Sequence, residues 1–291
     1  MASPPERSPF QRIGLVAKAA SREALRTANE LAEWLERRDL EVLLDEATLR
    51  AFPDRGSADP FHQDAEVDLV IVLGGDGTLL SVARSARRGV PILGVNLGSL
   101  GFLTELGRHE LYPSLVRVLA GNYTLEKRSL LRVELLRGGG QTAVWDIFND
   151  AVIAKSALAR IIRLTLTVDG DLVGNFRADG LIVSTPTGST AYNLSAGGPI
   201  VAPELPVAVI TPICPHTLSL RPLVVPDDRV IEVVLETQRE EVYLTLDGQE
   251  GTSLGFQNRV RIRRSDAAVH LVRTAERTFF ESLRGKLRWG G

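Results

Sequence analysis

Residues 67–78 read VDLVIVLGGDGT, a branched apolar run that passes directly into a glycine-rich turn. A nearly continuous apolar run of this length is typical of a strand that is covered on both faces of a sheet. After the turn, we expect a helix at 79–88 and a further strand at 91–95. Strands that alternate with helices favour an open, mostly parallel sheet.

The residues before and after this stretch extend the alternation. Residues 13–16 form an apolar run suited to a buried strand, and Ser21 can cap a helix whose apolar residues recur at helical spacing. We expect an extended piece at 41–44, a mobile loop at 54–64 and a helix at 111–119. The sequence therefore predicts an α/β N-terminal domain with a mostly parallel sheet over residues 12–121, after a flexible tail over residues 1–11.

From about residue 122 the spacing of apolar residues changes to a period of two. Apolar and polar residues alternate in 131–135, 162–168, 242–246 and 260–262, and turn signals separate these runs. Two of the turn signals are Asp169-Gly170 and Asp247-Gly248. This pattern predicts a β-rich, sandwich-like C-terminal domain over residues 122–274, because period-two runs joined by tight turns indicate hairpins. Helical spacing returns in a final segment, residues 275–291.

Composition narrows the class of protein. A length of 291 residues favours two domains, and a net charge of -2 gives no reason to expect a nucleic-acid partner. No apolar run approaches the ~20 residues that span a membrane, and no signal peptide is evident, so we expect a cytoplasmic protein with no membrane partner. The single cysteine, Cys214, excludes an intramolecular disulfide, and its apolar neighbours predict that it is buried.

The glycine-rich turn is the first candidate for chemistry. Its glycines let a ligand approach the backbone closely, and a helix start offers N–H groups to a phosphate. We therefore assign phosphate binding to Gly74, Gly75, Gly77 and Thr78. The turn lacks the Lys-Ser/Thr pair of a P-loop and the third glycine of the dinucleotide fingerprint. Asp76 can accept a proton from an attacking hydroxyl, help to hold Mg²⁺, or simply cap the helix.

A second stretch, residues 179–192, reads DGLIVSTPTGSTAY and is followed by SAGGP at 195–199. Its hydroxyls, glycines and prolines are denser than a turn requires. Hydroxyls and free backbone N–H groups can bind phosphates, ribose and base edges, and Tyr192 can stack on a purine. An ordinary polar loop is the alternative interpretation of the same composition.

Four blocks in this order, 74–78, 94–103, 149–150 and 179–199, resemble the bacterial type of the NAD kinase family. The resemblance extends from about Ile13 to residues 283–289. The Gly-Gly-Asp-Gly turn alone also occurs in lipid kinases and phosphofructokinases, whereas the 179–192 block is specific. The resemblance implies an enzyme that transfers the terminal phosphoryl group of ATP to the 2′-hydroxyl of the adenosine ribose of NAD, giving NADP.

The resemblance also implies roles for individual residues. Asp76 would be the general base, with Gly77 against the same ribose, and the pair Asn149-Asp150 would hold the adenosine part of NAD. The remaining implied NAD contacts are Arg160, Arg177, Asp179, Thr190, Ala191, Tyr192, Asn193, Leu194, Ser195 and Gln249. Several have simpler alternatives: a solvated turn acid for Asp150, an exposed strand residue for Arg177 and a turn residue for Gln249.

No cluster of metal ligands stands out in the sequence. We expect Mg²⁺ or another divalent ion to arrive with ATP, because phosphates and waters often hold Mg²⁺ with one or two carboxylates. The family resemblance further implies a homodimer or homotetramer, in which Arg160 or its neighbours reach a partner's site. It also implies that residues 275–291 pack back on the N-terminal domain.

Two other functions are compatible with parts of the sequence. A lipid kinase of the diacylglycerol or sphingosine type shares the Gly-Gly-Asp-Gly turn but needs an apolar acceptor pocket. A non-catalytic NAD(P)-binding sensor would bind the dinucleotide without turnover. The residues do not distinguish NAD from NADH as the acceptor, or ATP from polyphosphate as the donor. They also do not decide whether NADP(H) inhibits the enzyme.

Overall fold

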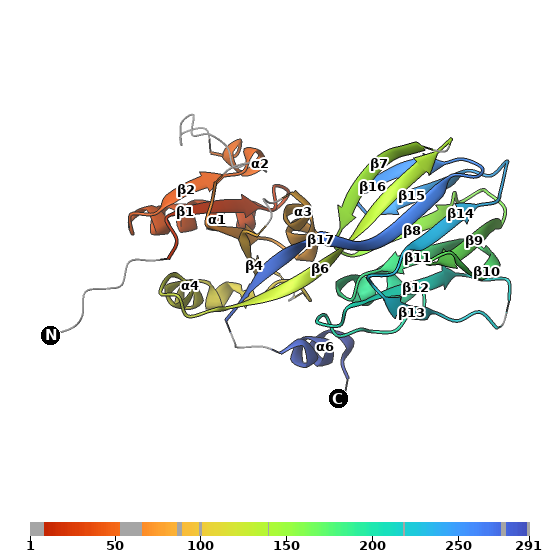
Figure 1. Cartoon of the computed structure of the whole chain (residues 1–291). Helices are drawn as coiled ribbons and strands as arrows, with labels where there is room; N and C mark the ends of the chain where they lie inside the picture. Colours follow the sequence, from red (N-terminus) through yellow and green to blue (C-terminus); the bar gives the residue numbers. More distant parts are fainter. Residues whose placement is uncertain are drawn as a thin grey trace. The chain divides into compact units, whose positions relative to one another are not determined.

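The computed structural model describes residues 9–52, 66–85, 89–98, 101–138, 140–217, 219–274 and 278–289. The chain forms two compact units, Met1–Lys127 with Val269–Gly291, and Arg128–Ala268. It passes from one unit to the other within two long strands, β6 (Thr124–Arg137) and β17 (Arg259–Arg273), which are labelled in Figure 1. The change in apolar spacing at 121–122 therefore does not coincide with the division between the units. The predicted loop at 54–64 lies outside the described residues, as do residues 1–8 of the predicted tail.

The first unit contains a parallel sheet in the order β2-β1-β3-β4, and β4 also pairs in parallel with β5 and with the end of β17. Apart from β17, the strands of this sheet are β1 (Arg12–Ala17), β2 (Glu41–Leu44), β3 (Leu69–Leu73), β4 (Pro91–Asn96) and β5 (Leu106–Gly107). Its helices are α1 (Arg22–Glu36), α2 (Glu46–Leu49), α3 (Asp76–Ser85), η2 (Arg108–Glu110), α4 (Leu111–Leu119) and α6 (Phe279–Leu287). In the described part of the chain, no helix has the length and apolar character needed to cross a membrane.

Local sequence explains these elements. Every residue of β3 is buried, as its apolar run predicts. The side chain of Ser21 accepts a hydrogen bond from the backbone N–H of Ala24 at 3.2 Å, which confirms the predicted cap of α1. The predicted helix after the turn is present, but it begins at Asp76 and not at about residue 79, and the predicted end at 86–88 lies outside the described residues. The carbonyl of Gly75 already accepts hydrogen bonds from the N–H groups of Thr78 and Leu79, so the turn is itself the first turn of the helix.

The second unit is built from antiparallel strands. One sheet has the order β13-β12-β11-β8-β15-β16; in the other part, β10, β9, β14 and β17 pair in sequence and β6 pairs with β7. Apart from β6 and β17, these strands are β7 (Gly140–Ile147), β8 (Asp150–Lys155), β9 (Ile162–Val168), β10 (Asp171–Ala178), β11 (Gly180–Ser184), β12 (Val207–Ile213), β13 (Leu223–Pro226), β14 (Ile231–Leu235), β15 (Val242–Leu246) and β16 (Glu250–Leu254). Two short helices, η3 (Thr187–Thr190) and α5 (Tyr192–Ser195), follow β11.

The core of the second unit is formed by apolar side chains from both groups of strands, the sheet that contains β11 and the part that contains β6 and β9. Leu131 and Leu164 pack in one buried cluster with Leu181 and Leu244. The turn Asp169-Gly170 has φ angles of 51° and 86°, which the tight hairpin between β9 and β10 requires. The structure therefore confirms the predicted fold class, an α/β N-terminal domain with a mostly parallel sheet and an antiparallel, sandwich-like C-terminal domain.

The prediction that Cys214 is buried is wrong. The cysteine is exposed and lies one residue beyond the end of β12. Its φ of 44° shows that the chain turns at this position. Of its two apolar neighbours only Ile213 belongs to the strand, whereas the cysteine and Pro215 lie in the loop that follows.

Candidate functional site

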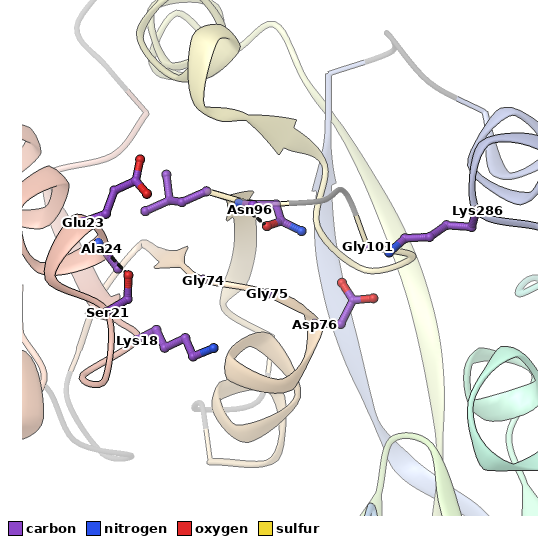
Figure 2. A pocket seen from close by; sticks show the side chains of 12 residues that line it. Lys18, Ser21, Glu23, Ala24, Gly74, Gly75, Asp76, Asn96, Gly101 and Lys286 are labelled. Atoms are coloured by element: carbon purple, nitrogen blue, oxygen red, sulfur yellow. Dashed lines mark hydrogen bonds between the residues drawn. The ribbon is translucent and has the colours of Figure 1, made fainter.

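The glycine-rich turn lies at the carboxyl end of β3 and lines a pocket of about 440 Å³. The pocket also receives residues from the loop after β1, the start of α1, the segment after β4, and α6 (Figure 2). Ligands of open α/β sheets bind outside the carboxyl ends of the strands. A Cβ atom at Gly74 would lie 2.6 Å from the hydroxyl oxygen of Thr78, so the tight turn at this position requires glycine.

Two lysines line this pocket, and neither is among the site residues that the sequence predicts. Lys18 follows β1 immediately and lies on the α1 side of the turn, whereas Lys286 extends from α6 toward Gly101 (Figure 2). Lys18 could have been found from its position after a parallel strand, next in the sheet to the strand that carries the turn. The acidic Glu23 in the pocket is paired with Arg108. The lysines therefore place positive charge beside the turn.

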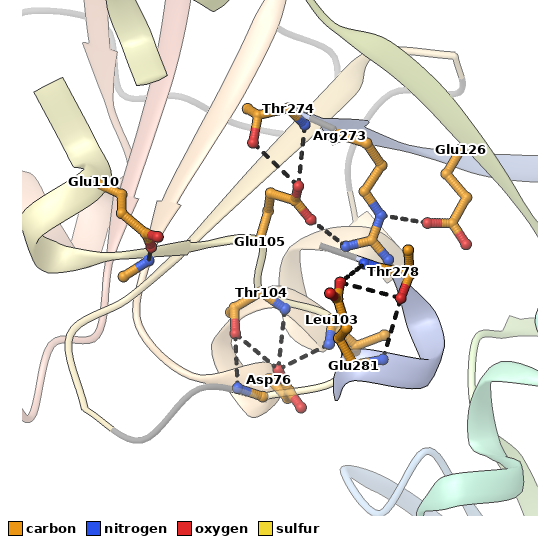
Figure 3. Close-up of polar contacts among 12 residues, drawn as sticks. Asp76, Leu103, Thr104, Glu105, Glu110, Glu126, Arg273, Thr274, Thr278 and Glu281 are labelled. Atoms are coloured by element: carbon orange, nitrogen blue, oxygen red, sulfur yellow. Dashed lines mark hydrogen bonds and ion pairs between the residues drawn. The ribbon is translucent and has the colours of Figure 1, made fainter. Parts of the chain in front are cut away.

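The carboxylate of Asp76 is held by the segment that follows β4 (Figure 3). One oxygen accepts a hydrogen bond from the N–H of Phe102 at 2.7 Å. The other accepts from the N–H of Leu103 at 3.2 Å and from the N–H and hydroxyl of Thr104, both at 3.3 Å. A Cβ atom at Gly101 would lie 1.8 Å from the same carboxylate. The fold thus brings together two of the sequence blocks, 74–78 and 94–103.

A second pocket, of about 460 Å³, lies within the second unit. It brings together four predicted site residues, Asn149, Asp150, Ala191 and Tyr192, and adds Val152, Ala154, Thr245, Asp247 and Gly248. The loops that form it are in close contact, because a Cβ atom at Gly188 would lie 2.2 Å from the carbonyl oxygen of Asn149. The blocks 149–150 and 179–192 therefore meet in space.

Two buried carboxylates lie in this second pocket. Asp150 is 4% exposed and Asp247 is 5% exposed, so Asp150 is not a solvated turn acid. The carboxylate of Asp247 accepts hydrogen bonds from three successive backbone N–H groups, those of Phe148, Asn149 and Asp150, at 2.6–3.2 Å. Burial, together with the charge of Asp247, raises the pKa of Asp150 to about 7. In the sequence Asp247 was noted only as half of a turn signal.

The hydroxyl-rich block is held mainly by its own hydrogen bonds. Asn193 is fully buried, its amide nitrogen donates to the carbonyls of Ser189 at 3.1 Å and Pro199 at 3.0 Å, and its amide oxygen accepts from Thr211 at 2.6 Å. The hydroxyl of Thr190 donates to the carbonyl of Thr187 at 3.2 Å. These contacts shape the loop that carries Ala191 and Tyr192.

The other predicted contacts are absent from the described lining of both pockets. Arg160 is exposed, and its backbone N–H donates to Glu240 at 2.8 Å. Arg177 is exposed on β10, and Asp179 lies 3.8 Å from the ammonium of Lys155. The described lining of the two pockets also lacks five further predicted residues: Gly77, Thr78, Leu194, Ser195 and Gln249. Their predicted roles stay predictions.

A metal ion would have few protein ligands at either pocket. Within the described residues, no group of three or more His, Cys, Asp and Glu side chains is arranged to hold a metal ion. The first pocket offers the carboxylates of Asp76 and Glu23. This donor set fits an ion that phosphates and waters hold for the most part, as Mg²⁺ often is in kinases.

Both parts of the chain match domains of one protein family. Residues 13–123 match the ATP-NAD kinase N-terminal domain family, and residues 148–274 match the ATP-NAD kinase C-terminal domain family. The NAD kinase of Geotalea daltonii is 49% identical over 97% of this chain and 99% of its own. The NAD kinase of Heliobacterium modesticaldum is 41% identical over 96% and 99%, respectively.

Two solved structures resemble this one. The crystal structure of yeast NADH kinase complexed with NADH has a TM-score of 0.88 and 24% identity, covering 97% of this chain and 89% of its own. The crystal structure of an NAD kinase from Archaeoglobus fulgidus in complex with ATP has a TM-score of 0.73 and 28% identity, covering 97% and 100%. From its two matched domains and its full-length relatives, we conclude that the chain belongs to the NAD kinase family.

Proposed function

We propose that the protein transfers the terminal phosphoryl group of ATP to the 2′-hydroxyl of the adenosine ribose of NAD, with Asp76 as the general base. The observation that carries this proposal is the position of Asp76. Its carboxylate lies at the start of α3, in a pocket that also holds the Gly74-Gly75 backbone and two lysines. A base, a phosphate cradle and cationic side chains are the components that phosphoryl transfer to a hydroxyl requires.

The donor phosphates would bind in this first pocket. The start of α3 presents backbone N–H groups and the positive end of a helix dipole, both of which favour a phosphate. Lys18 and Lys286 would neutralise part of the charge on the phosphates, and charge stabilisation together with alignment supplies most of the catalysis in such reactions. The lining is polar and charged, which does not suit the lipid acceptor of a diacylglycerol-type kinase.

The adenosine part of NAD would bind in the second pocket. Asn149, between β7 and β8, and Asp150, at the start of β8, offer polar groups, while Tyr192 offers a ring. Tyr192 is 46% exposed at the start of α5, so its ring is accessible for stacking on a purine. Ala191 leaves space beside it.

In the chemical step, the 2′-oxygen of the ribose forms a bond to the γ-phosphorus as the bond from that phosphorus to the ADP oxygen breaks. The hydroxyl proton moves to an oxygen of Asp76. The N–H groups of Phe102 and Leu103 hold the carboxylate in a fixed orientation for this transfer. A Mg²⁺ ion bound to the ATP phosphates would neutralise developing charge, and Glu23 is the carboxylate of this pocket, besides the base, that could assist in holding it.

The direct test is NADP formation from NAD, ATP and Mg²⁺, with Asp76→Asn as the comparison. We expect the variant to lose about 10²–10⁴-fold in kcat, the usual contribution of a general base, and to retain NAD binding measured by calorimetry. No NADP from the parent protein with ATP or polyphosphate would remove the activity. Full turnover by Asp76→Asn would remove only the role of Asp76.

The same assay separates the two rival functions. A lipid kinase would phosphorylate diacylglycerol and leave NAD unchanged. A non-catalytic sensor would bind NAD or NADP in the calorimeter and give no product. Substituting NADH for NAD in the assay tests the second acceptor.

A further inference from the structure

The segment that holds Asp76 is itself attached to the end of β17 through a partly buried ionic cluster, in which Glu105 is the buried member. Glu105 follows Thr104 directly and is 4% exposed. One of its oxygens accepts hydrogen bonds from the N–H of Thr274 at 3.0 Å and from the hydroxyl of Thr274 at 3.2 Å. The other accepts from the guanidinium of Arg273 at 2.5 Å (Figure 3). Arg273 lies 168 positions from Glu105 in the sequence, and Thr274 lies 169 positions from it.

Arg273 also pairs with Glu126 on β6, so one guanidinium lies between two carboxylates. Burial alone lowers the pKa of the Arg273 guanidinium, but the charges of Glu126 and Glu105 outweigh burial and the net shift is upward. The arginine therefore stays charged, and a partly buried charge pair with several hydrogen bonds has a strongly preferred geometry. The cluster is suited to fixing the position of a backbone segment.

That position matters at Asp76, because the hydrogen bonds that its carboxylate accepts within the described residues come from residues 102–104, just before Glu105. The hydroxyl of Thr104 connects the two: it donates to Asp76 and accepts from the N–H of Gly101 at 3.1 Å. Thr104 is 3% exposed. The N–H of Glu105 donates to the carbonyl of Gly94 in β4 at 2.9 Å, which fixes the segment to the sheet as well.

We propose that Glu105 and Arg273 are positioning residues for the general base: they fix the 101–104 segment, whose N–H groups and Thr104 hydroxyl set the orientation of the Asp76 carboxylate. The proposal rests on the proposed function only in taking Asp76 as the base. Neither residue lines the pocket described around Asp76, so they act through Thr104 and the backbone and not on a substrate.

The test compares Glu105→Gln with Glu126→Gln. Each substitution neutralises one of the two carboxylates that pair with the Arg273 guanidinium, but only Glu105 adjoins the segment that holds Asp76. We expect Glu105→Gln to lower kcat about 10–100-fold, since small misplacement of a catalytic group has effects of this size, with KM for NAD and ATP within about threefold of the parent. Glu126→Gln should keep kcat within about threefold. Equal kcat in Glu105→Gln and the parent would overturn the proposal.

A second comparison separates positioning from a general loss of structure. In the Asp76→Asn background, Glu105→Gln should lower kcat by less than about threefold, because the base that it positions is already gone. A loss as large as in the parent background would show that Glu105 acts on turnover by another route. Thr104→Val, which removes the hydroxyl without removing a charge, should behave like Glu105→Gln in both backgrounds, and Thr104→Ser should restore most of the activity.

A readout without turnover keeps this proposal distinct from the proposed function. Hydrogen exchange of the unliganded protein should be faster at the amides of residues 102–104 in Glu105→Gln, by about tenfold or more, with the peptides of α1 unchanged. Unchanged exchange at 102–104 would overturn the proposal even if the enzyme proved to be an NAD kinase. Faster exchange at 102–104 would support the fixing of this segment by Glu105, and the turnover comparison in the two backgrounds then tests whether the carboxylate that the segment holds is the base.

Discussion

The buried acid Asp150 gives the most direct test of the electrostatics in the second unit. Its pKa is raised from 3.8 to about 7, first by burial and then by the nearby charge of Asp247. The folded protein therefore holds this proton more tightly than the unfolded chain does. The resulting stabilisation is complete below about pH 4 and is lost as the pH rises through about 7.

The magnitude follows from the two pKa values. A separation of about three pKa units corresponds to about 4 kcal/mol in the free energy of unfolding. About 3 kcal/mol of this is lost between pH 5 and pH 8.5. Both figures are upper bounds, because relaxation and water penetration reduce the penalty of a buried charge. Asp150→Asn removes the titration, so the variant should show a correspondingly smaller loss of stability over the same interval.

Denaturant unfolding at a series of pH values measures this difference. Trp145 is the one tryptophan of three that lies in the second unit, so Trp34→Phe and Trp289→Phe give a background in which fluorescence reports that unit. Asp171→Asn, an exposed acid on β10, removes one carboxylate without changing the buried pair and should keep the parental pH dependence. If Asp150→Asn keeps the parental pH dependence as well, the reasoning about burial is refuted.

Three further substitutions test the proposed binding sites. Lys18→Ala should raise KM for ATP about tenfold and leave KM for NAD unchanged, because one charge-assisted contact to phosphate is lost; initial rates measure both. Gly101→Ala places a Cβ 1.8 Å from an oxygen of Asp76 and should lower kcat by about 10²–10⁴-fold, as losing the base would. Gly188→Ala places a Cβ 2.2 Å from the carbonyl oxygen of Asn149 and should weaken NAD binding in the calorimeter.

The sequence predicted those strands and turns that are determined by residues close together in the chain. The apolar run of β3 specifies a buried strand, and Asp169-Gly170 specifies a tight hairpin because its backbone needs positive φ at both positions. The sequence identified the four motif blocks, but their meeting in two pairs, 74–78 with 94–103 and 149–150 with 179–192, was found only in the structure. The start of α3 was misplaced because a glycine-rich turn suggests a loop, whereas this turn is already helical.

Contacts between distant residues were not predictable from these patterns. Arg273 is the last residue of β17, a strand in which apolar and polar residues alternate, and nothing in the neighbouring sequence indicates Glu105 as its partner. The parallel pairing of the end of β17 with β4 brings the two together, at His270 with Pro91 and Leu271 with Ile92. Lys286 reaches the first pocket from a helix near the end of the chain. Such contacts depend on tertiary pairing, which neither period nor composition encodes.

The two pockets also show why a motif alone does not identify a catalytic acid. Asp76 and Asp247 each precede a glycine, and each accepts hydrogen bonds from three successive backbone N–H groups. Their surroundings differ: Asp247 is 5% exposed and lies beside a second buried acid, whereas Asp76 begins a helix in a pocket that Lys18 also lines. A base for a hydroxyl that attacks a phosphate needs cations for that phosphate nearby, and only the surroundings of Asp76 provide them. The same local device therefore shapes a binding loop in one unit and orients the proposed base in the other.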